Sequence, residues 1–141
     1  KASQIWGLAR RSLRYPIFES AYPAVTITSS ASANTFGSWI QLIADVGTNK
    51  KLYYVELSPL SISATDRSIE FEVGEGAAAS EVAVARGGFL LNHANAVSMG
   101  YMPVVVSIAL NLTNNARLSA RVRDSVASAI TYSIHIEVST S

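Results

Sequence analysis

The sequence predicts an all-β domain of antiparallel strands that follows an extended N-terminal arm. Two observations predict this fold class: apolar and polar residues alternate with a period of two from Ala24 onward, and turn-forming residues interrupt the alternation at short intervals. A parallel βαβ fold would need amphipathic segments with a period of 3.6 residues between its strands, and this region of the sequence has none. Short and closely spaced strands of this kind favour a sandwich or a barrel.

Four strands are expected in the first half of the domain, each with apolar residues at every second position. In the third strand, Tyr53 shares a face with Val55 and Leu57. In the fourth, Glu70 and Glu72 lie on the face opposite the apolar residues. The four strands cover residues 25–27, 39–43, 53–57 and 69–73.

Three more strands are expected in the second half, and they cover residues 104–112, 118–123 and 132–138. The last shows the clearest alternation, with apolar residues at its even positions and polar residues between them. Thr113-Asn114-Asn115 forms a turn between the first two, since asparagine tolerates positive φ. The alanine-rich residues 77–85 read equally well as a short helix or as a strand. Breaker residues separate the strands, and Gly87-Gly88 is one of these breaks.

The composition indicates a domain that is stable by packing and shares part of its surface with a partner. The 141 residues suffice for one domain with its own core. Only 15% of them are charged, against about 25% in an average soluble domain, so we expect a partner to cover part of the surface. The sequence has no cysteine, which rules out disulfides, thiolate zinc sites and cysteine nucleophiles. No apolar run approaches the 18 or so residues of a membrane helix, so no membrane partner is expected.

Residues 1–23 form the predicted arm and residues 24–141 the predicted β-sandwich domain. Tyr15-Pro16 and Tyr22-Pro23 favour an extended chain, because a residue before proline is biased away from the helical region. Of the 11 basic residues 4 lie before Tyr15 and give residues 1–14 a charge of +4, while the remaining 7 with the 10 acidic residues give residues 15–141 a charge of −3. Arm and body can therefore attract each other between copies, while a solvated basic terminus explains the charge equally well. The basic arm residues are Lys1, Arg10, Arg11 and Arg14.

The sequence contains no arrangement that indicates catalysis, a cofactor or a metal. Gly74-Glu75-Gly76 superficially resembles a dinucleotide-binding turn, but the helix and the later carboxylate of that motif do not follow, so we interpret it as an inter-strand loop. Neither His93 nor His135 has a sequence neighbour that would orient it as a base or complete a zinc site. We therefore expect no enzyme activity, no cofactor and no metal.

Two charged rows are candidates for an interface. Glu70 and Glu72 share one strand face, and Arg121 and Arg123 share another. Placed opposite each other across a sheet or a subunit boundary, these rows form charge-assisted pairs that fix register or orientation. The alternative is two ordinary solvent-facing rows.

The arm combines arginines with aromatic residues, as nucleic-acid binders do, but the body lacks a matching basic surface, so direct nucleic-acid binding is not expected.

Three segments of the sequence resemble a recurring class of tailed-bacteriophage virion proteins. They are Ser38-Trp39-Ile40-Gln41-Leu42-Ile43-Ala44, Ile69-Glu70-Phe71-Glu72-Val73-Gly74-Glu75-Gly76 with its continuation through Ser80-Glu81, and Leu118-Ser119-Ala120-Arg121-Val122-Arg123-Asp124-Ser125. The resemblance extends over residues 25–138. It implies a β-sandwich with jelly-roll-like topology and a structural role in the virion, on the capsid or in the neck and tail.

The leading hypothesis is therefore a capsid decoration or cement protein, located in the virion. It would form a homo-oligomer such as a trimer and contact the major capsid protein or other virion proteins. The residues expected to make protein contacts are Trp6, Arg10, Arg11 and Arg14 in the arm, and Arg121 and Arg123 in the body. One alternative is a neck or tail component. Another is a carbohydrate-binding sandwich at a host-contact site, in which Tyr53, Tyr54 or Tyr101 stacks on a sugar.

Overall fold

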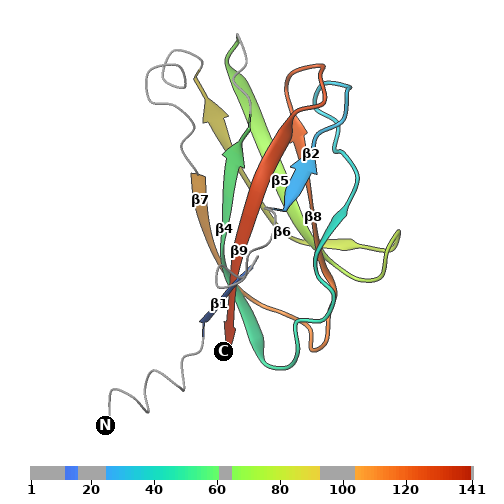
Figure 1. Ribbon diagram of the computed structural model, residues 1–141, viewed down its shortest axis with the longest axis vertical. Helices are drawn as coiled ribbons and strands as arrows, with labels where there is room; N and C mark the ends of the chain where they lie inside the picture. Colours follow the sequence, from blue (N-terminus) through green and yellow to red (C-terminus); the bar gives the residue numbers. More distant parts are fainter. Residues whose placement is uncertain (1–11, 16–24, 61–64, 93–103, 141) are drawn as a thin grey trace.

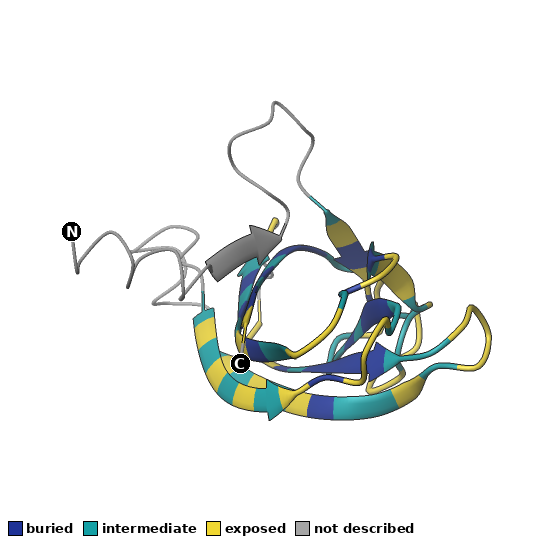
Figure 2. Ribbon diagram, turned by 90° about the horizontal axis from the view of Figure 1, so that it is seen from below, coloured by how far each residue is buried: buried dark blue, intermediate teal, exposed yellow. Residues whose placement is uncertain are grey.

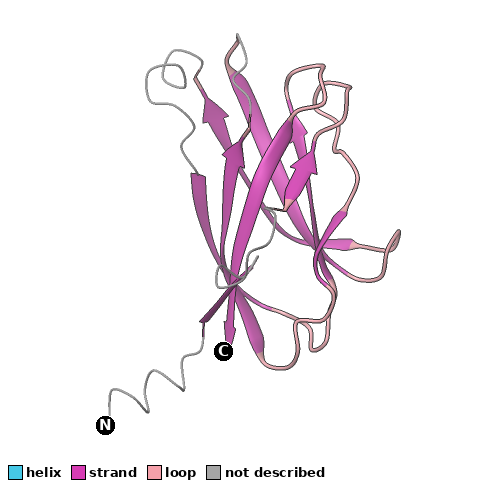
Figure 3. Cartoon of the chain, viewed as in Figure 1, coloured by secondary structure: helices cyan, strands magenta, loops and turns pink. Residues whose placement is uncertain are grey.

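The computed structural model describes residues 12–15, 25–60, 65–92 and 104–140, and these residues form strands, turns and loops without a helix (Figure 3). The strands in chain order are β1 (Ser12–Tyr15), β2 (Thr26–Thr28), β3 (Ile40–Ile43), β4 (Lys50–Pro59), β5 (Arg67–Glu75), β6 (Val82–Leu91), β7 (Val104–Asn111), β8 (Leu118–Asp124) and β9 (Thr131–Thr140). No helix long and apolar enough to cross a membrane occurs in the described residues.

Two antiparallel sheets form the two layers of the domain (Figure 1). The strand order of the first sheet is β1-β9-β4-β7, and β2 also pairs with β9. The order of the second sheet is β3-β8-β5-β6. With β1 set aside, β2-β9-β4-β7 facing β3-β8-β5-β6 is the arrangement of an eight-stranded jelly roll. The predicted all-β sandwich with jelly-roll-like topology is confirmed.

The core lies between the sheets and is built from alternate residues of their strands. Along β9, every even position from Tyr132 to Val138 is buried, as the period-two pattern predicts. In β5, Ile69, Phe71 and Val73 face the same core. Seen from below in Figure 2, the buried stretches surround a common interior. The alternation therefore decides which side of each strand joins the core.

Strand β4 departs from the predicted alternation at Tyr53. The sequence predicts that Tyr53 is buried together with Val55, but Leu52 is fully buried instead and Tyr53 is 37% exposed. The register of β4 against both β7 and β9 shifts between Leu52 and Tyr54, which marks a β-bulge. On β7, Ala109 near the same level has a positive φ of 57°. A one-residue irregularity reverses which face the residues before it occupy, and the sequence pattern does not reveal it.

The sequence predicted a break between strands at Gly87-Gly88, but both glycines lie inside β6. They pair with Phe71 and Glu70 of β5. A Cβ atom at Gly87 would lie 2.6 Å from Phe71 Cζ and 3.1 Å from Val106 Cγ1. Glycine is needed here because the large aromatic ring of the core approaches the β6 backbone closely.

The turns at one end of the sandwich follow the local sequence. Strand β6 begins at Val82, and residues before it form the turn from β5, so the strand interpretation of residues 82–85 is correct. Gly76 and Ala79 adopt positive φ values of 127° and 66° in this turn. In the turn between β7 and β8, Asn115 has a φ of 59°, as the asparagine pair predicts.

Strand β1 lies within the segment that the sequence assigns to the arm. It pairs antiparallel with β9, with Ser12 opposite Ser139 and Tyr15 opposite Ile136. Farther along the same edge of β9, Thr26 of β2 lies opposite Ser133. Residues 1–11 and 16–24 lie outside the described part of the chain.

A buried polar cluster joins the two sheets around Asp124 of β8. The side chains of Arg67 and Asp124 are fully buried, and Arg67 Nη1 lies 3.4 Å from Asp124 Oδ2. The Tyr132 hydroxyl donates a hydrogen bond to Asp124 Oδ2, and the backbone N–H of Val126 donates to Oδ1 at 3.0 Å. Burial raises the pKa of Tyr132, and the hydrogen bond to Asp124 raises it further. Tyr132 therefore stays neutral and acts as a donor across the sandwich.

Replacing this donor should destabilise the fold. We expect Tyr132→Phe to lower the free energy of unfolding by about 1–3 kcal/mol, because a buried carboxylate loses one of its hydrogen-bond donors. Tyr53→Phe is the matched control, and we expect a change within about 0.5 kcal/mol because Tyr53 is 37% exposed. Urea denaturation of both variants measures the difference. Equal losses in the two variants would contradict the role assigned to the Tyr132 hydroxyl.

Candidate functional site on the outer face of the second sheet

Five charged side chains cross the outer face of the sheet β3-β8-β5-β6, and we call them the charged ladder: Glu70, Glu72, Arg86, Arg121 and Arg123. Glu72 lies opposite Arg121 of β8 and Arg86 of β6 in register, and Glu70 lies opposite Arg123. Glu72 Oε2 is 2.7 Å from Arg121 Nη2, and its Oε1 is 2.9 Å from Arg86 Nε. Glu70 Oε2 is 2.5 Å from Arg123 Nη2. The two rows singled out in the sequence therefore pair across one sheet, which confirms the pairing alternative.

The charged ladder is buried at Glu72 and open at its ends. The side chain of Glu72 is only 2% exposed, whereas that of Arg86 is 67% exposed. Glu70 and Arg123 are 34% and 37% exposed. A buried carboxylate is tolerated only when it is paired and hydrogen-bonded, and two guanidinium groups satisfy Glu72. Glu72 is thus the residue that fixes the geometry of the charged ladder.

Two aromatic rings cover the arginines of β8. The guanidinium carbon of Arg121 lies 4.5 Å from the centre of the Phe36 ring and 4.4 Å from that of Trp39. Arg123 lies 5.1 Å from the Phe36 ring. A Cβ atom at Gly74 would lie 2.8 Å from Trp39 Cη2, so Gly74 leaves room for the indole over β5. Cation–π contacts of this kind hold the arginines against the sheet and shield Glu72 from water.

The segment between β2 and β3 carries both rings and is fixed along β8. The backbone N–H of Asn34 donates to the carbonyl of Asp124 at 2.7 Å, and that of Gly37 donates to the carbonyl of Val122 at 3.0 Å. Asn34 has a positive φ of 56°, a conformation that asparagine tolerates better than most residues. The segment therefore extends the pairing of β3 with β8 and places its aromatic residues on the outer face.

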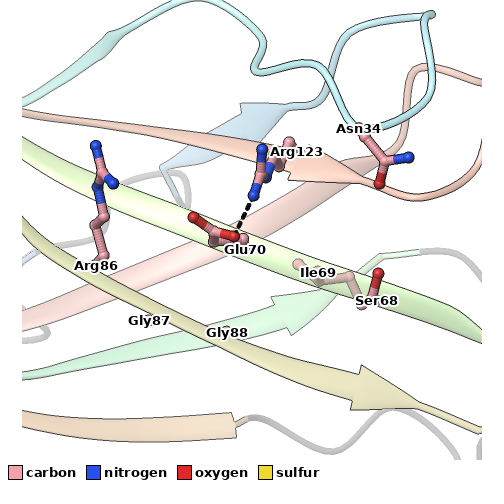
Figure 4. Close-up of a pocket in the computed structure, with 8 residues that line it drawn as sticks. All are labelled: Asn34, Ser68, Ile69, Glu70, Arg86, Gly87, Gly88 and Arg123. Carbon is pink, nitrogen blue, oxygen red and sulfur yellow. Dashed lines mark hydrogen bonds and ion pairs between the residues drawn. The ribbon is translucent and has the colours of Figure 1, made fainter.

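A pocket of about 260 Å³ lies beside the charged ladder (Figure 4). In this view the pair of Glu70 and Arg123 stands between Arg86 at one end and Asn34 with Ser68 at the other. Hydroxyl, amide, carboxylate and guanidinium groups are all present, so the pocket offers both hydrogen-bond donors and acceptors. The lining residues are Asn34, Ser68, Ile69, Glu70, Arg86, Gly87, Gly88 and Arg123.

The chemistry of this face is charge pairing and hydrogen bonding. The pocket brings two guanidinium groups and one carboxylate together, a set that can bind a polar ligand or a charged side chain of another protein. Within the part of the chain that the structure describes, no three histidine, aspartate or glutamate residues gather as metal ligands would.

The structure places the predicted interface residues in three different situations. Arg121 and Arg123 belong to the charged ladder, and their side chains are 30% and 37% exposed. Arg14 lies in β1, where its Cα is the partner of Glu137 in β9. The residues that lie outside the described part of the chain are Trp6, Arg10 and Arg11.

Sequence reasoning missed the third arginine and the aromatic cover. Arg86 pairs with Glu72 because β5 and β6 form a hairpin, and the two residues are equally distant from Ala79 in its turn. This spacing was the available signal, but it is informative only once residues 82–91 are known to be a strand. The sequence predicts Trp39 as the first residue of a strand, but β3 begins at Ile40, and Phe36 and Trp39 lie in the segment before it that runs along β8.

The structure describes one of the two histidines. His93 lies outside the described residues. His135 lies on β9, where it is partly buried and faces Glu56 of β4 in register. Among the described residues that line the pocket beside the charged ladder there is no histidine.

Comparison with known proteins finds similarity in fold only. No protein-family model and no curated protein matches the chain. A structure of the Gx strain of infectious bursal disease virus is similar, with 14% identity and a TM-score of 0.51 over 93% of this chain and 33% of that chain. The Gt strain gives 11% identity and a TM-score of 0.49 over 93% and 32%, and a VP2 subviral particle of the virus gives 12% and 0.28 over 93% and 30%.

This chain thus spans about a third of the length of the viral chains that it resembles. The similarity to the Gx strain structure is one of fold. None of these three structures comes from a tailed bacteriophage, so the assignment to that class of virus stays a prediction.

The uneven burial of the charged ladder predicts unequal roles for its two carboxylates. We expect Glu72→Gln to lower the free energy of unfolding by about 1–3 kcal/mol, because two arginines lose a buried charged acceptor. The matched control is Glu70→Gln, for which we expect a loss below about 1 kcal/mol because the pair with Arg123 is partly exposed. Thermal or chemical denaturation at one pH compares them. A larger loss at Glu70 would refute the central role of Glu72.

Proposed function

We propose that the chain is a virion structural protein that acts without catalytic chemistry, as a capsid decoration or cement protein. In this role it stabilises the shell through contacts with its own copies and with the major capsid protein. The observation that carries the proposal is the strand order β2-β9-β4-β7 facing β3-β8-β5-β6. Jelly rolls of this kind are a common architecture of viral capsid domains.

Three further observations support a role in assembly. Segments that include Trp39, Glu72 and Arg121 resemble tailed-bacteriophage virion proteins. The fold is similar to part of a structure of infectious bursal disease virus, at a TM-score of 0.51. Only 15% of the residues are charged, which suits a surface that other proteins cover.

In the proposed mechanism, the body and the arm have different structural roles. The sandwich supplies a rigid body whose outer face is braced by the charged ladder. The arm, with Trp6, Arg10, Arg11 and Arg14, contacts a neighbouring subunit or the shell. Residues 1–14 carry a charge of +4 and residues 15–141 a charge of −3, and these opposite charges favour contact between neighbouring copies.

The number of copies per particle tests the proposed function, and it also tests whether the chain lies on the shell or in the neck or tail. Quantitative mass spectrometry of purified particles should give hundreds of copies of this chain relative to the major shell protein. A dozen copies or fewer would instead indicate the neck or tail, and absence from particles would contradict a virion role. Deleting residues 1–15 should lower the copy number if the arm makes the contacts. An Arg10→Gln, Arg11→Gln variant keeps β1, and it should also lower the copy number if these two arginines make the contacts.

A second candidate function is the binding of a saccharide at a host-contact site, and the polar pocket beside the charged ladder favours it. Its carboxylate, amide, hydroxyl and guanidinium groups match the hydroxyl groups of a sugar. Tyr53 is exposed and Tyr54 half-buried on β4, while Tyr101 lies outside the described residues. Glycan-array binding that Arg86→Gln abolishes and Tyr53→Ala leaves intact would support the pocket. Loss on Tyr53→Ala alone would instead support stacking on the tyrosine.

A further inference from the structure

One edge of β9 holds two separate segments of the chain. β9 pairs with β4 along one edge, while β1 and β2 share the other. β1 pairs with residues 136–139 of β9, and β2 pairs with residues 131–133 (Figure 1). Both segments run antiparallel to β9, so they follow one another in the same direction along its edge.

The connection between β1 and β2 is much longer than this arrangement requires. Tyr15 pairs with Ile136 and Thr26 with Ser133. These two β9 residues are three positions apart, which is about 10 Å along a strand. The chain from Tyr15 to Thr26 has eleven residue steps and can span about 36 Å when extended. Its length therefore allows β1 to reach the β9 edge of another molecule.

Charge at the pairing positions favours this contact in either molecule. Arg14 of β1 and Glu137 of β9 are partners in register. Opposite charges at facing positions of an antiparallel pair stabilise the pairing. The same attraction acts over a longer range, because residues 1–14 contribute +4 and residues 15–141 contribute −3. The β1 segment of one copy is thus complementary to the β9 edge of any copy.

We propose that β1 is exchanged between copies, so that in the assembled protein β1 of one copy pairs with residues 136–139 of β9 in a second copy. This inference rests on the self-assembly that the proposed function includes. Exchange replaces one pairing by an identical one, so local concentration decides between the two arrangements. Because β1 is covalently linked to its own sandwich, that sandwich meets it at an effective concentration on the order of millimolar. Neighbouring copies in an assembly reach this range, whereas dilute protein does not.

Mixed single-cysteine variants test the exchange directly. The chain has no cysteine, and Ser12 and Ser139 are Cα partners in register. Facing Cα atoms of antiparallel strands are about 4.5–5.5 Å apart, a separation that a disulfide can bridge. When Ser12→Cys and Ser139→Cys proteins are prepared separately, mixed at assembling concentration and oxidised mildly, a disulfide between these two positions forms only between molecules. We expect a linked dimer on non-reducing gels, at least tenfold more abundant than in a dilute mixture.

The matched control mixes Ser12→Cys with Ser107→Cys. Ser107 is exposed on β7, two strands away from β9 in the same sheet, and this change also replaces serine by cysteine without altering charge. We expect at least tenfold less linked dimer from this mixture. Equal yields from the two mixtures would overturn the proposal, because random collision would then explain both.

Light scattering on the same samples separates the exchange from the function on which it rests. Oligomers that give no linked dimer from the Ser12→Cys and Ser139→Cys mixture would overturn the exchange and leave self-assembly intact. A protein that stays monomeric at every concentration would overturn self-assembly and the exchange together. In the double variant Ser12→Cys, Ser139→Cys, dilute protein should form the disulfide within one chain, which verifies the register of β1 on β9.

Discussion

The pairing of β9 along both of its edges is the constraint on which the first sheet depends. One edge is occupied along the length of β4, and the other by β1 and β2. The even positions of β9 fill the core, and Tyr132 reaches across it to Asp124 of the second sheet. A slip of one residue would turn each of these side chains outward and remove this link. Register is therefore specified by the core and by the polar cluster at once.

The second sheet differs from the first because it buries a charged residue on its outer face. Glu72 lies on the face opposite the core residue Phe71, yet its side chain is almost inaccessible. Arg121 and Arg86 satisfy its two oxygens, and Trp39 covers the arrangement. A buried ion pair adds little to stability when compared with apolar packing, but it strongly disfavours arrangements that leave the charge unpaired. The charged ladder thus defines how β5, β6 and β8 align.

These two features leave different surfaces available to partners. On the face of the second sheet, its own side chains and the segment before β3 cover Glu72, while Arg86 and the polar pocket stay accessible. The β9 edge is instead completed by main-chain pairing with β1, a contact that depends little on the identity of the molecule that supplies the strand. In the proposed assembly role, the sandwich therefore provides the rigid body, and β1 provides the strand that pairs with a second copy.

Over most of the domain, the side of each strand that faces the core can be read from the amino-acid sequence alone. Period-two alternation correctly placed the apolar residues of β5, β8 and β9 inside, and it put the glutamates of β5 and the arginines of β8 each on the face of their own strand that lies opposite the core residues. These are local properties, since successive side chains of a strand point to opposite faces whatever the neighbouring strands are. Jelly-roll topology was implied by a family resemblance, and the observed strand order bears it out.

Only the tertiary structure decided the features that depend on which strands meet. The bulge that exposes Tyr53 arises from the register of β4 against two neighbouring strands. Position 87 of β6 needs glycine because the Phe71 ring lies against its backbone. The burial of Glu72 likewise depends on Arg86, which pairs with it, and on Trp39, which covers its other partner Arg121. Neither residue is close to Glu72 in the sequence. The position of β1 on β9 joins residues more than a hundred positions apart. Long-range pairing energies settle such contacts, and no local pattern in the sequence encodes them.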